Sequence, residues 1–432
     1  MSATMSNRAR RSVGLSAGLL LLGCGLVWGC ASPASAAGLA TSDASRAPGT
    51  AEEARQAAES MDAFGFDLYH RLGADGNLVF SPASIYVALS MAGAGARGET
   101  ATQIETVLHQ SPGAARGNGV NSLDQALAAL SGTWTDQAGK PHDVRLSIAN
   151  APFAQNGMRI APDYLDVLAS SYGAGLRLLD YRTDPLGATK AINAWVSDRT
   201  EKRIPKLIDP PLDSMTRLVL VNAIYLKAPW TDPFSDSRTA DAPFTRADGT
   251  TVSVPTMNRS FETSYAQGDG WQAVQLPYAD GSLAMTIVVP SDLAAFEAGL
   301  DGSRFASIVG ALSGAEVHLW LPRFKTETKA RLGDLLNQLG MPLAMDPSRA
   351  DFSGITTEQA LFISDVIHQA NITVDEKGTE ASAATAVVMA GSARPTEVKT
   401  LKVDRPFLFA LRDTKTGAIL FLGRIVDPSA GA

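Results

Sequence analysis

Cysteine is almost absent from this chain of 432 residues, and both of its cysteines, Cys24 and Cys30, lie close to the N-terminus. The remainder of the chain therefore offers no thiol for a disulfide, a nucleophile or a cysteine-based metal site. Its five histidines are scattered, and no two of them have the spacing of a metal-binding pair. We expect no metal and no other cofactor, and a fold that is held together by its apolar core alone.

The chain also lacks a strong excess of one charge, because 37 Lys and Arg residues face 44 Asp and Glu residues. The resulting net charge of -7 gives no positive field for a nucleic acid. No clustered basic stripe indicates a heparin-like cofactor. Apolar residues make up 45% of the chain and charged residues 19%, a balance that is typical of a globular protein with a large core.

The apolar run over residues 13–28 follows Arg8, Arg10 and Arg11 and precedes small residues at 34–37. This order of charged, apolar and small residues is typical of a secretory signal. The run is short for a membrane span of about 20 residues, which disfavours a retained anchor. We therefore predict that residues 1–36 are a leader and that the protein is exported, either to the extracellular space or to the cell envelope.

The leader leaves two export routes open. Leu21–Cys24 is similar to a bacterial lipobox, in which Cys24 carries the lipid, and the alternative is plain secretion. Val27–Cys30 fits a lipobox less well because the bulky Trp28 stands beside the cut. A twin-arginine signal at Arg10–Arg11 is a weaker match. The sequence therefore predicts export and leaves the lipid attachment undecided.

Residues 37–54 are rich in Ala, Ser, Gly and Pro, which predicts a flexible spacer, and residues 55–428 are predicted to form a single domain. Helical periodicity dominates its first half and strand patterns its second half, which indicates an α+β fold. The segment 361–374 looks like a strand with a helical start. Expected helices lie at 53–72, 85–92, 100–108, 162–171, 189–200 and 332–339, and expected strands at 77–80, 144–154, 218–226, 271–277, 282–289, 317–322, 361–374, 407–411 and 419–425.

Motifs of catalysis are few and lack their structural context. The pattern G-x-G-x-x-G occurs at 93–98, but it follows a predicted helix, whereas a phosphate cradle follows a strand. The pattern G-x-S-x-G at 14–18 lies inside the leader and has no meaning as a nucleophile elbow. No serine elsewhere stands in a nucleophile context, so we do not expect an enzyme.

The segment Val374–Met389 combines two kinds of structure. It opens with a charged turn and then has no bulky residue from Glu380 to Ala386. With a period of two, one face carries Thr379, Ala381, Ala383, Thr385 and Val387, which a sheet can bury. Loop-forming sequences nevertheless bracket the segment. A stretch that suits a buried strand but is placed as a loop indicates two states.

Five segments in order along the chain resemble the motifs of one family, the serpins. Asn77–Ile85 resembles N-I-F-F-S-P-x-S-I, and Leu220–Phe234 resembles L-V-N-A-I-Y-F-K-G-x-W-x-x-P-F. Val374–Ala384 resembles the serpin hinge V-D-E-x-G-T-E-A-A-A-A. Residues 404–409 and 423–428 resemble the C-terminal signatures. Together the matches span nearly the whole domain and are highly specific, although no single one is.

The resemblance implies a serpin fold with three β-sheets, eight or nine helices and an exposed reactive-centre loop. It also implies a suicide inhibitor whose partner is a serine protease, with cysteine proteases as a second class, and a monomer is expected. Together with the leader, this predicts a bacterial, exported inhibitor. In the implied mechanism the protease cuts the loop and forms an acyl-enzyme. The cut loop then inserts as a new central strand and distorts the attached protease before deacylation.

Specific residues take family roles through the same resemblance. Gly378 permits a backbone reversal at the hinge, and small inward residues after it can enter a sheet without overpacking or buried charge. Because non-inhibitory serpins often carry bulkier or charged residues there, this hinge favours inhibition. The implied hinge residues are Glu376, Gly378, Thr379, Glu380, Ala381 and Ala383, the implied shutter residues are Ser81, Ser84, Asn222 and His368, and the implied breach residue is Trp230.

The position of the cleaved bond depends on the end from which the loop is counted. Counting from Glu376 places it at Ser392–Ala393, whereas counting back from Pro406 places it near Pro395–Thr396. The bait residue therefore lies between Met389 and Thr396. Arg394 is a poor site for a trypsin-like enzyme because Pro395 follows it.

The sequence Met389–Ser392 instead suits elastase-, subtilisin- or chymotrypsin-like proteases, which accept small or medium apolar residues. Two other functions stay open at this stage. One is a non-inhibitory serpin that serves as a cell-surface binding module, which the small hinge residues disfavour. The other is a hydrolase, which the missing motifs disfavour.

Overall fold

The computed structural model describes residues 38–73, 75–111, 114–135, 139–380 and 398–431, all of which belong to one compact unit, Ala36–Ala432. Nine α-helices occur in these ranges. The α+β class predicted from the sequence is confirmed. The helices are α1 (Ala51–Tyr69), α2 (Pro82–Gly95), α3 (Gly98–Val107), α4 (Ala114–Ala128), α5 (Pro162–Tyr172), α6 (Pro185–Arg199), α7 (Leu293–Glu297), α8 (Gly302–Ala311) and α9 (Gly333–Leu339).

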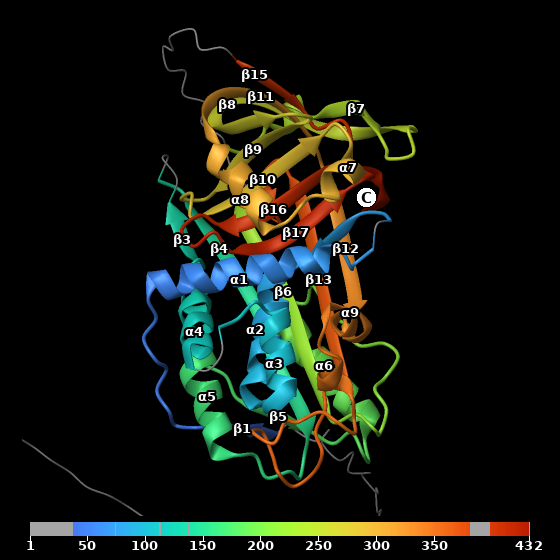
Figure 1. Ribbon diagram of the computed structural model, residues 1–432. Coiled ribbons are helices and arrows are strands. Elements are labelled where there is room, and N and C mark those ends of the chain that lie inside the picture. The colour runs from blue at the N-terminus through green and yellow to red at the C-terminus, as the bar shows by residue number, and fades with distance from the viewer. Residues whose placement is uncertain (1–37, 74, 112–113, 136–138, 381–397, 432) are drawn as a thin grey trace, which may run out of the picture. The chain divides into compact units, whose positions relative to one another are not determined.

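The first sheet has eight strands, with β3 (Gly132–Thr135) paired to one of its members outside the main order. The order places β6 beside a very short strand, β14, and also beside β13. Figure 1 shows β6 and β13 side by side, with α2 beside β6, against which it packs. The main order is β1 (Gly38–Ala40), β5 (Leu176–Leu179), β4 (Pro141–Gln155), β6 (Leu218–Pro229), β14 (Gly378–Thr379), β13 (Asp365–Asp375) and β12 (Phe324–Arg331).

The second sheet has nine strands in one continuous hydrogen-bonded order. Its two parts correspond to two of the three sheets that the serpin resemblance implies. Its two parts meet only where the end of β8, Ser264–Gly268, pairs with β9. On one side of this joint lie β7 (Ala240–Thr245), β8 (Thr251–Gly268), β11 (Ser313–Pro322) and β15 (Lys399–Lys402), and on the other lie β2 (Leu78–Phe80), β9 (Trp271–Tyr278), β10 (Leu283–Pro290), β16 (Phe407–Asp413) and β17 (Ile419–Ile425).

Strand β6 is buried on both faces, as its almost continuous apolar sequence predicts. One face, including Val219 and Val221, packs in a cluster with Ile192 and Val196 of α6. The opposite face, including Leu220 and Ile224, belongs to the main core together with α2. Helix α2 is apolar all round and almost entirely buried, which is the expected character of a central core helix. The sheet therefore lies between α2 and α6.

Residues 38–54 lie on the domain, whereas their composition predicts a flexible spacer for 37–54. Strand β1 pairs antiparallel with β5, and the amide of Ala47 donates to the carbonyl of Ser170 at 2.9 Å. Thr50 caps α1 by accepting a hydrogen bond from the amide of Glu53. The composition of this segment shows that it has few bulky apolar residues. It does not show the backbone hydrogen bonds that hold the segment on the domain, so the prediction of a flexible spacer is wrong.

The segment 361–374 also differs from expectation at its start. The strand β13 begins at Asp365, and residues 361–364 are not helical. Leu361 and Ile363 are buried, and the amide of Ile363 bonds to the carbonyl of Ala344. Their apolar character therefore reflects core packing of an extended segment, which periodicity in a short window does not distinguish from a helix.

Candidate functional site

Strands β6 and β13 meet in two different ways along their length. From Asp365 opposite Val219 to Ala370 opposite Ile224 they pair directly and in parallel. Towards their other end β14 lies between them and pairs antiparallel with both. Thr379 stands opposite Val374 on one side and opposite Ala228 on the other. The sheet is thus closed along one part and already holds one extra strand along the next.

The turn that leads into β14 depends on Gly378. Its φ of 142° is rarely accessible to residues with a side chain. A Cβ at this position would meet the carbonyl oxygen of Ala228 at 2.2 Å, so the two backbones approach too closely for any other residue. The amide of Lys377 donates to the Asp375 carboxylate at 2.8 Å and closes the turn. Gly378 therefore permits both the reversal and the entry of β14.

Thr379 is buried under the sheet with 1% of its surface exposed. Its hydroxyl and that of Tyr278 share a hydrogen bond of 2.6 Å. Tyr278 stacks on Trp230 with ring centroids 4.1 Å apart, and Trp230 Nε1 donates to the carbonyl of Asp375 at 2.9 Å. The implied breach residue therefore contacts the hinge turn, through its own hydrogen bond and through Tyr278.

Glu376 holds the hinge turn to two residues that adjoin strands β11 and β7 of the second sheet, Arg323 and Thr239. Arg323 Nε donates to both carboxylate oxygens, at 2.8 and 2.9 Å, and the hydroxyl of Thr239 donates to one of them. Burial opposes ionisation of the carboxyl, but the hydrogen bonds from Arg323 and Thr239 outweigh it, so the pKa of Glu376 lies below its usual value. Glu376 is thus an anion that one cationic donor, Arg323, and one hydroxyl donor, Thr239, hold in place.

Glu380 marks the last described residue of the hinge and lies in a different environment. Its φ is 49°, so the backbone leaves the sheet in a left-handed conformation. Its carboxylate lies 3.1 Å from Arg203 Nε in the segment after α6. Burial raises the pKa of Glu380, and Arg203 only partly opposes this rise. The amide of Glu380 still donates to the carbonyl of Thr373 at 3.2 Å, in register with β13. A strained backbone and a partly desolvated carboxyl therefore coincide at the last described residue of the hinge.

The four implied shutter residues come together beneath β6 and β13. The amide of Ser81 donates to His368 Nε2 at 3.1 Å, and His368 Nδ1 lies 2.6 Å from the side-chain oxygen Oδ1 of Asn222. The amide of Ser84 donates to the Ser81 hydroxyl, which caps α2. His368 and Asn222 stand opposite each other in the directly paired part of the two strands. Parting the strands must break this contact.

The charge state of His368 follows from these contacts. Burial lowers the pKa of His368 to about 3, so its imidazole is neutral. Since Nε2 accepts from the Ser81 amide, the proton sits on Nδ1 and is donated to Asn222. The side-chain nitrogen of Asn222 is buried and has no hydrogen-bond partner among the described residues. A strand that enters between β6 and β13 would bring new acceptors to this region.

Several residues that sequence reasoning did not single out complete the site. Tyr278, Arg323 and Arg203 contact Thr379, Glu376 and Glu380, respectively. Asn150 of β4 accepts a 2.8 Å hydrogen bond from the Ser84 hydroxyl and stands opposite Asn222. The family signature around Trp230 and the strand predicted at 271–277 were the nearest signals, but neither indicates where the Tyr278 hydroxyl points.

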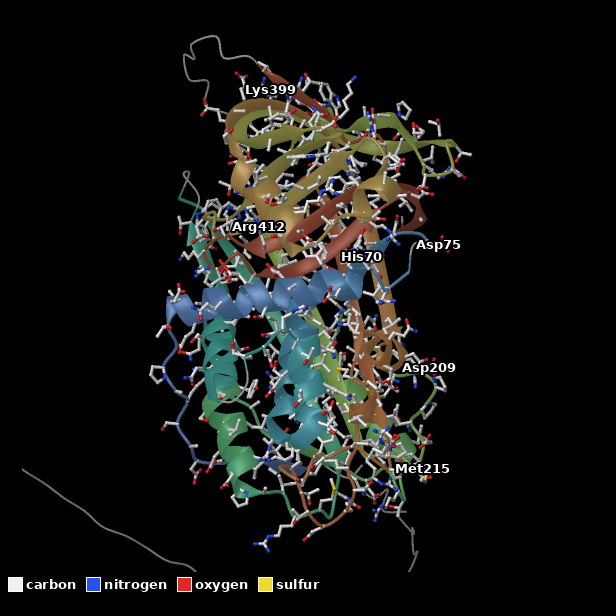
Figure 2. All side chains as sticks on the ribbon, in the orientation of Figure 1. His70, Asp75, Asp209, Met215, Lys399 and Arg412 are labelled. Carbon is white, nitrogen blue, oxygen red and sulfur yellow. The ribbon has the colours of Figure 1, made fainter. Side chains whose placement is uncertain are left out.

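The remaining predicted positions lie outside the described residues. They are Ala381 and Ala383 of the hinge and the whole bait region, Met389–Thr396, with Ser392 and Ala393. Lys399, just after this interval, begins β15 at one end of the domain, and Met215 lies towards the opposite end (Figure 2).

The described ranges contain neither a metal cluster nor a helix that could cross a membrane. No group of three His, Cys, Asp or Glu side chains there is arranged to hold a metal. None of the helices in these ranges has both the length and the apolar character that a membrane span requires.

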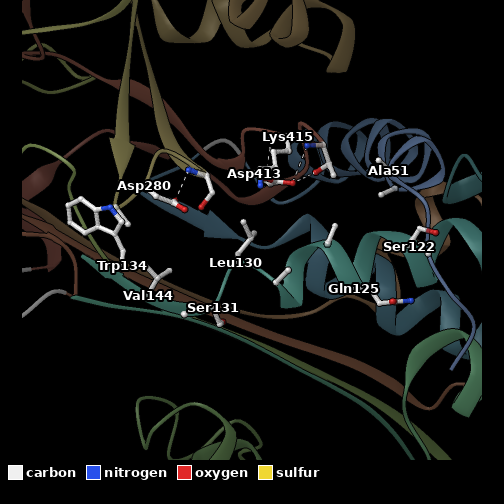
Figure 3. A pocket seen from close by; sticks show the side chains of 18 of the residues that line it. Ala51, Ser122, Gln125, Leu130, Ser131, Trp134, Val144, Asp280, Asp413 and Lys415 are labelled. Atoms are coloured by element: carbon white, nitrogen blue, oxygen red, sulfur yellow. Dashed lines mark hydrogen bonds between the residues drawn. The ribbon is translucent and has the colours of Figure 1, made fainter. Parts of the chain in front are cut away.

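A hollow of 580 Å³ between α1, α4 and β3, shown in Figure 3, contains none of the predicted site residues.

Comparison with known proteins places this geometry in a family. The chain matches the sequence profile described as Serpin (serine protease inhibitor) over residues 59–428. The chain belongs to the serpin family. Among similar serpins, an uncharacterized serpin-like protein of Thermococcus kodakarensis is 36% identical over 378 residues, which cover 86% of each chain. Leukocyte elastase inhibitor A of Rattus norvegicus is 34% identical over 388 residues, covering 86% of this chain and 100% of the relative.

The serpin fold itself is confirmed by solved structures. The native state of tengpin, a thermophilic serpin, matches with a TM-score of 0.78 at 25% identity, covering 90% of this chain and 99% of tengpin.

Proposed function

We propose that this serpin is a suicide inhibitor of serine proteases that traps its target by inserting the cleaved loop between β6 and β13. One observation carries the proposal: β14 already pairs antiparallel with both strands at one end of the gap. Further insertion replaces one parallel ladder with two antiparallel ladders. Antiparallel pairing is slightly more stable per residue and the number of ladders doubles, so insertion is favourable.

The register of the three strands supports the same reaction. The offset between β6 and β13 is the same where they pair directly and where β14 separates them. The sheet therefore has to widen, but the two strands do not have to slide. Continuation of the β14 register would place Val388 opposite Asp365 and Val219, at the end of the paired region. The segment 378–388 thus matches the length of the gap.

The side chains of this segment suit the two faces of the sheet. Thr379 faces inward, so the same face would receive Ala381, Ala383, Thr385 and Val387 in a strand with a period of two. All are small or β-branched, and none carries a charge into the core. This pattern favours inhibition over a non-inhibitory binding role.

The proposed target is an elastase-, subtilisin- or chymotrypsin-like protease that cuts between Met389 and Thr396, with Ser392–Ala393 as the first candidate bond. The choice rests on the small and medium apolar residues of Met389–Ser392 and on Pro395, which hinders cleavage after Arg394. The name of the rat relative, leukocyte elastase inhibitor A, agrees with an elastase-like target.

A protease panel tests the proposed function. The purified protein is incubated with elastase-, subtilisin-, chymotrypsin- and trypsin-like enzymes, and the products are separated on a denaturing gel. We expect a covalent complex that survives denaturant with at least one of the first three classes, and mass spectrometry of the released peptide gives the cleaved bond. Cleavage without a complex across the whole panel would contradict inhibition and would favour the alternative, a non-inhibitory serpin that serves as a binding module.

We further propose that the protein is exported by a bacterium and anchored to the envelope through a lipid on Cys24. The charged, apolar and small-residue order of residues 1–36 and the lipobox-like Leu21–Cys24 support this proposal. After expression in a bacterial host, Cys24→Ser should move the protein from the membrane fraction to the soluble exported fraction. Cys30→Ser is the matched control and should leave it in the membrane fraction. Equal fractionation of both variants with the parent would argue against lipid attachment at Cys24.

A further inference from the structure

A second hollow of 640 Å³ lies beside β4 and β5 of the first sheet and reaches both faces of β4, with α6 on one face and α2, α4 and α5 on the other. This volume is in the range of pockets that hold small organic ligands. It contains none of the hinge or breach residues, and it is separate from the hollow of Figure 3. Its lining includes cations without a counter-charge and hydrogen-bond donors without an acceptor.

Two cationic side chains of the lining share one aromatic ring. The guanidinium carbon of Arg177 lies 5.1 Å from the ring centre of Trp195, and that of Arg199 lies 5.8 Å from it. Among the described residues, neither arginine has a carboxylate within 4.0 Å. Burial, together with the charge of Arg199, lowers the pKa of Arg177. Two neighbouring cations without a counter-charge repel each other, and an anion would relieve this repulsion.

Two further donors of the lining are buried and unused. Trp195 Nε1 and the side-chain nitrogen of Asn150 have no hydrogen-bond partner among the described residues, and neither atom is reached by solvent. A buried donor without an acceptor is unfavourable, because nothing compensates the loss of its hydrogen bond to water. All four groups require an acceptor or an anion, so they point to the same ligand chemistry.

The acidic side chain on the opposite wall does not change this conclusion. Asp124 also lines the hollow, but it forms an ion pair of 2.5 Å with Arg46. Arg46 additionally donates to the Asn121 side chain at 3.0 Å. Asp124 is thus neutralised locally, and the two unpaired cations remain Arg177 and Arg199. The rest of the lining includes apolar side chains, among them Leu39, Val87, Met91 and Ile148.

We propose that this hollow is a binding site for a small organic carboxylate, with the carboxylate between Arg177 and Arg199 and an apolar body against the aliphatic lining. Trp195 Nε1 supplies a further hydrogen bond to the head group, whereas the Asn150 side-chain nitrogen, on the other face of β4, supplies one to a polar substituent of the body. Guanidinium groups bind carboxylates by charge-assisted hydrogen bonds, which are stronger than neutral ones. The proposal does not depend on protease inhibition.

Isothermal titration calorimetry of the full chain with 2-naphthoate tests the site, with 2-naphthylmethanol as the uncharged probe of the same body. We expect saturable 1:1 binding of naphthoate and at least about tenfold weaker binding of the alcohol. Arg177→Gln should weaken naphthoate binding by about tenfold or more, since it removes a charge-assisted pair. Trp195→Phe keeps an aromatic ring beside Phe153, but it removes the donor and reduces the ring that the two arginines share. Both charges stay, so it should weaken binding by a smaller factor.

Arg71→Gln is the matched control, because Arg71 is exposed and does not line the hollow. It should bind naphthoate as the parent does. Arg199→Gln provides a second test at an exposed position in case Arg177→Gln does not fold. Equal affinity for naphthoate and the alcohol, or equal affinity of the Arg199→Gln and Arg71→Gln variants for naphthoate, would overturn the proposal.

Discussion

The hinge end and the shutter end of the β6–β13 pair differ in what lies between the strands. At the hinge end β14 separates them, and a charged clamp formed by Glu376 and Arg323 holds the turn. At the shutter end the strands touch directly, and a neutral relay from Ser81 through His368 to Asn222 joins them. One sheet thus contains an inserted and a closed arrangement of the same two strands.

The difference shows what each region contributes. The hinge has groups that hold an added strand, namely an inward hydroxyl pair and a glycine turn. The shutter has groups that keep the strands together until they are parted, and it leaves the Asn222 side-chain nitrogen without a partner. We infer that the hinge starts insertion and that the shutter sets its barrier. Changes at the two ends should therefore have different consequences.

Thr379→Arg should have the largest effect, because it places a large charged side chain where the hinge is 1% exposed. Burying an unpaired charge and overpacking the site both oppose insertion. The loop should still be cut, so the inhibitor becomes a substrate, and the fraction of protease trapped should fall by about tenfold or more. Gel densitometry of complex against cleaved product measures this fraction. Thr379→Ser is the control, and full trapping by Thr379→Arg would refute the hinge assignment.

Gly378→Ala should expel β14 from the sheet without changing the downstream loop. The new Cβ would lie 2.2 Å from the Ala228 carbonyl oxygen, and the φ of 142° would be strained. Once released, Glu376 and Glu380 should become accessible to a glutamate-specific endopeptidase, and mass spectrometry detects the cuts. Gly249→Ala, at a positive φ in open space, is the control for backbone strain alone. Equal protection of the hinge in both variants would contradict the close packing described for Gly378.

Asn222→Ala should weaken the shutter. It leaves His368 Nδ1–H without its acceptor in a fully buried place, which costs about 1–3 kcal/mol. The strands should part more easily, so we expect latent or polymeric protein on mild warming, detected by size-exclusion chromatography. Asn258→Ala, on β8 of the second sheet, is a control that removes an amide outside the strand pair. An Asn222→Ala protein that stays monomeric and fully active would argue against the shutter role.

Lowering the pH should destabilise the native shutter through His368. Its native pKa of about 3 lies below the unfolded value of 6.5, so between these values the unfolded chain binds a proton that the native chain does not. The free energy of unfolding therefore falls as the pH falls below 6.5, and from pH 7.5 to pH 5 the loss is about 2 kcal/mol. Urea unfolding at both pH values measures it. The free energy of unfolding of His368→Gln should fall by about 2 kcal/mol less than that of the parent over the same pH range. Identical pH dependence in both proteins would count against a neutral His368.

Much of the fold follows from local patterns, and the parts that do not have identifiable causes. The apolar run at 218–226 and the Ser81–Pro82 cap predict β6 and the start of α2 because burial and capping are written into neighbouring residues. Strand β12, at the edge of the first sheet, escapes prediction because its exposed positions are charged and two of its inward positions, Thr326 and Thr328, are polar. The long β8 is missed for a similar reason, since much of it is only partly buried.

The site divides in the same way. The family motifs locate Gly378, Asn222, His368 and Trp230, but they do not reveal that β14 is already seated, because a strand of two residues has no periodicity. Its strand state depends on partners more than a hundred residues away in β6. Tyr278 and Arg323 are likewise defined by tertiary contact alone.

The most direct test of loop insertion is the distance between residues 388 and 215 before and after reaction with a target protease. Spin labels at Val388→Cys and Met215→Cys, in a Cys24→Ser/Cys30→Ser background, report it by double electron–electron resonance; Met215 is 68% exposed and tolerates a label. If Val388 inserts opposite Val219, the reacted protein should show a single distance below about 25 Å, because four strand residues span about 13 Å and the labels add the rest. A distance distribution that cleavage leaves unchanged would contradict insertion between β6 and β13.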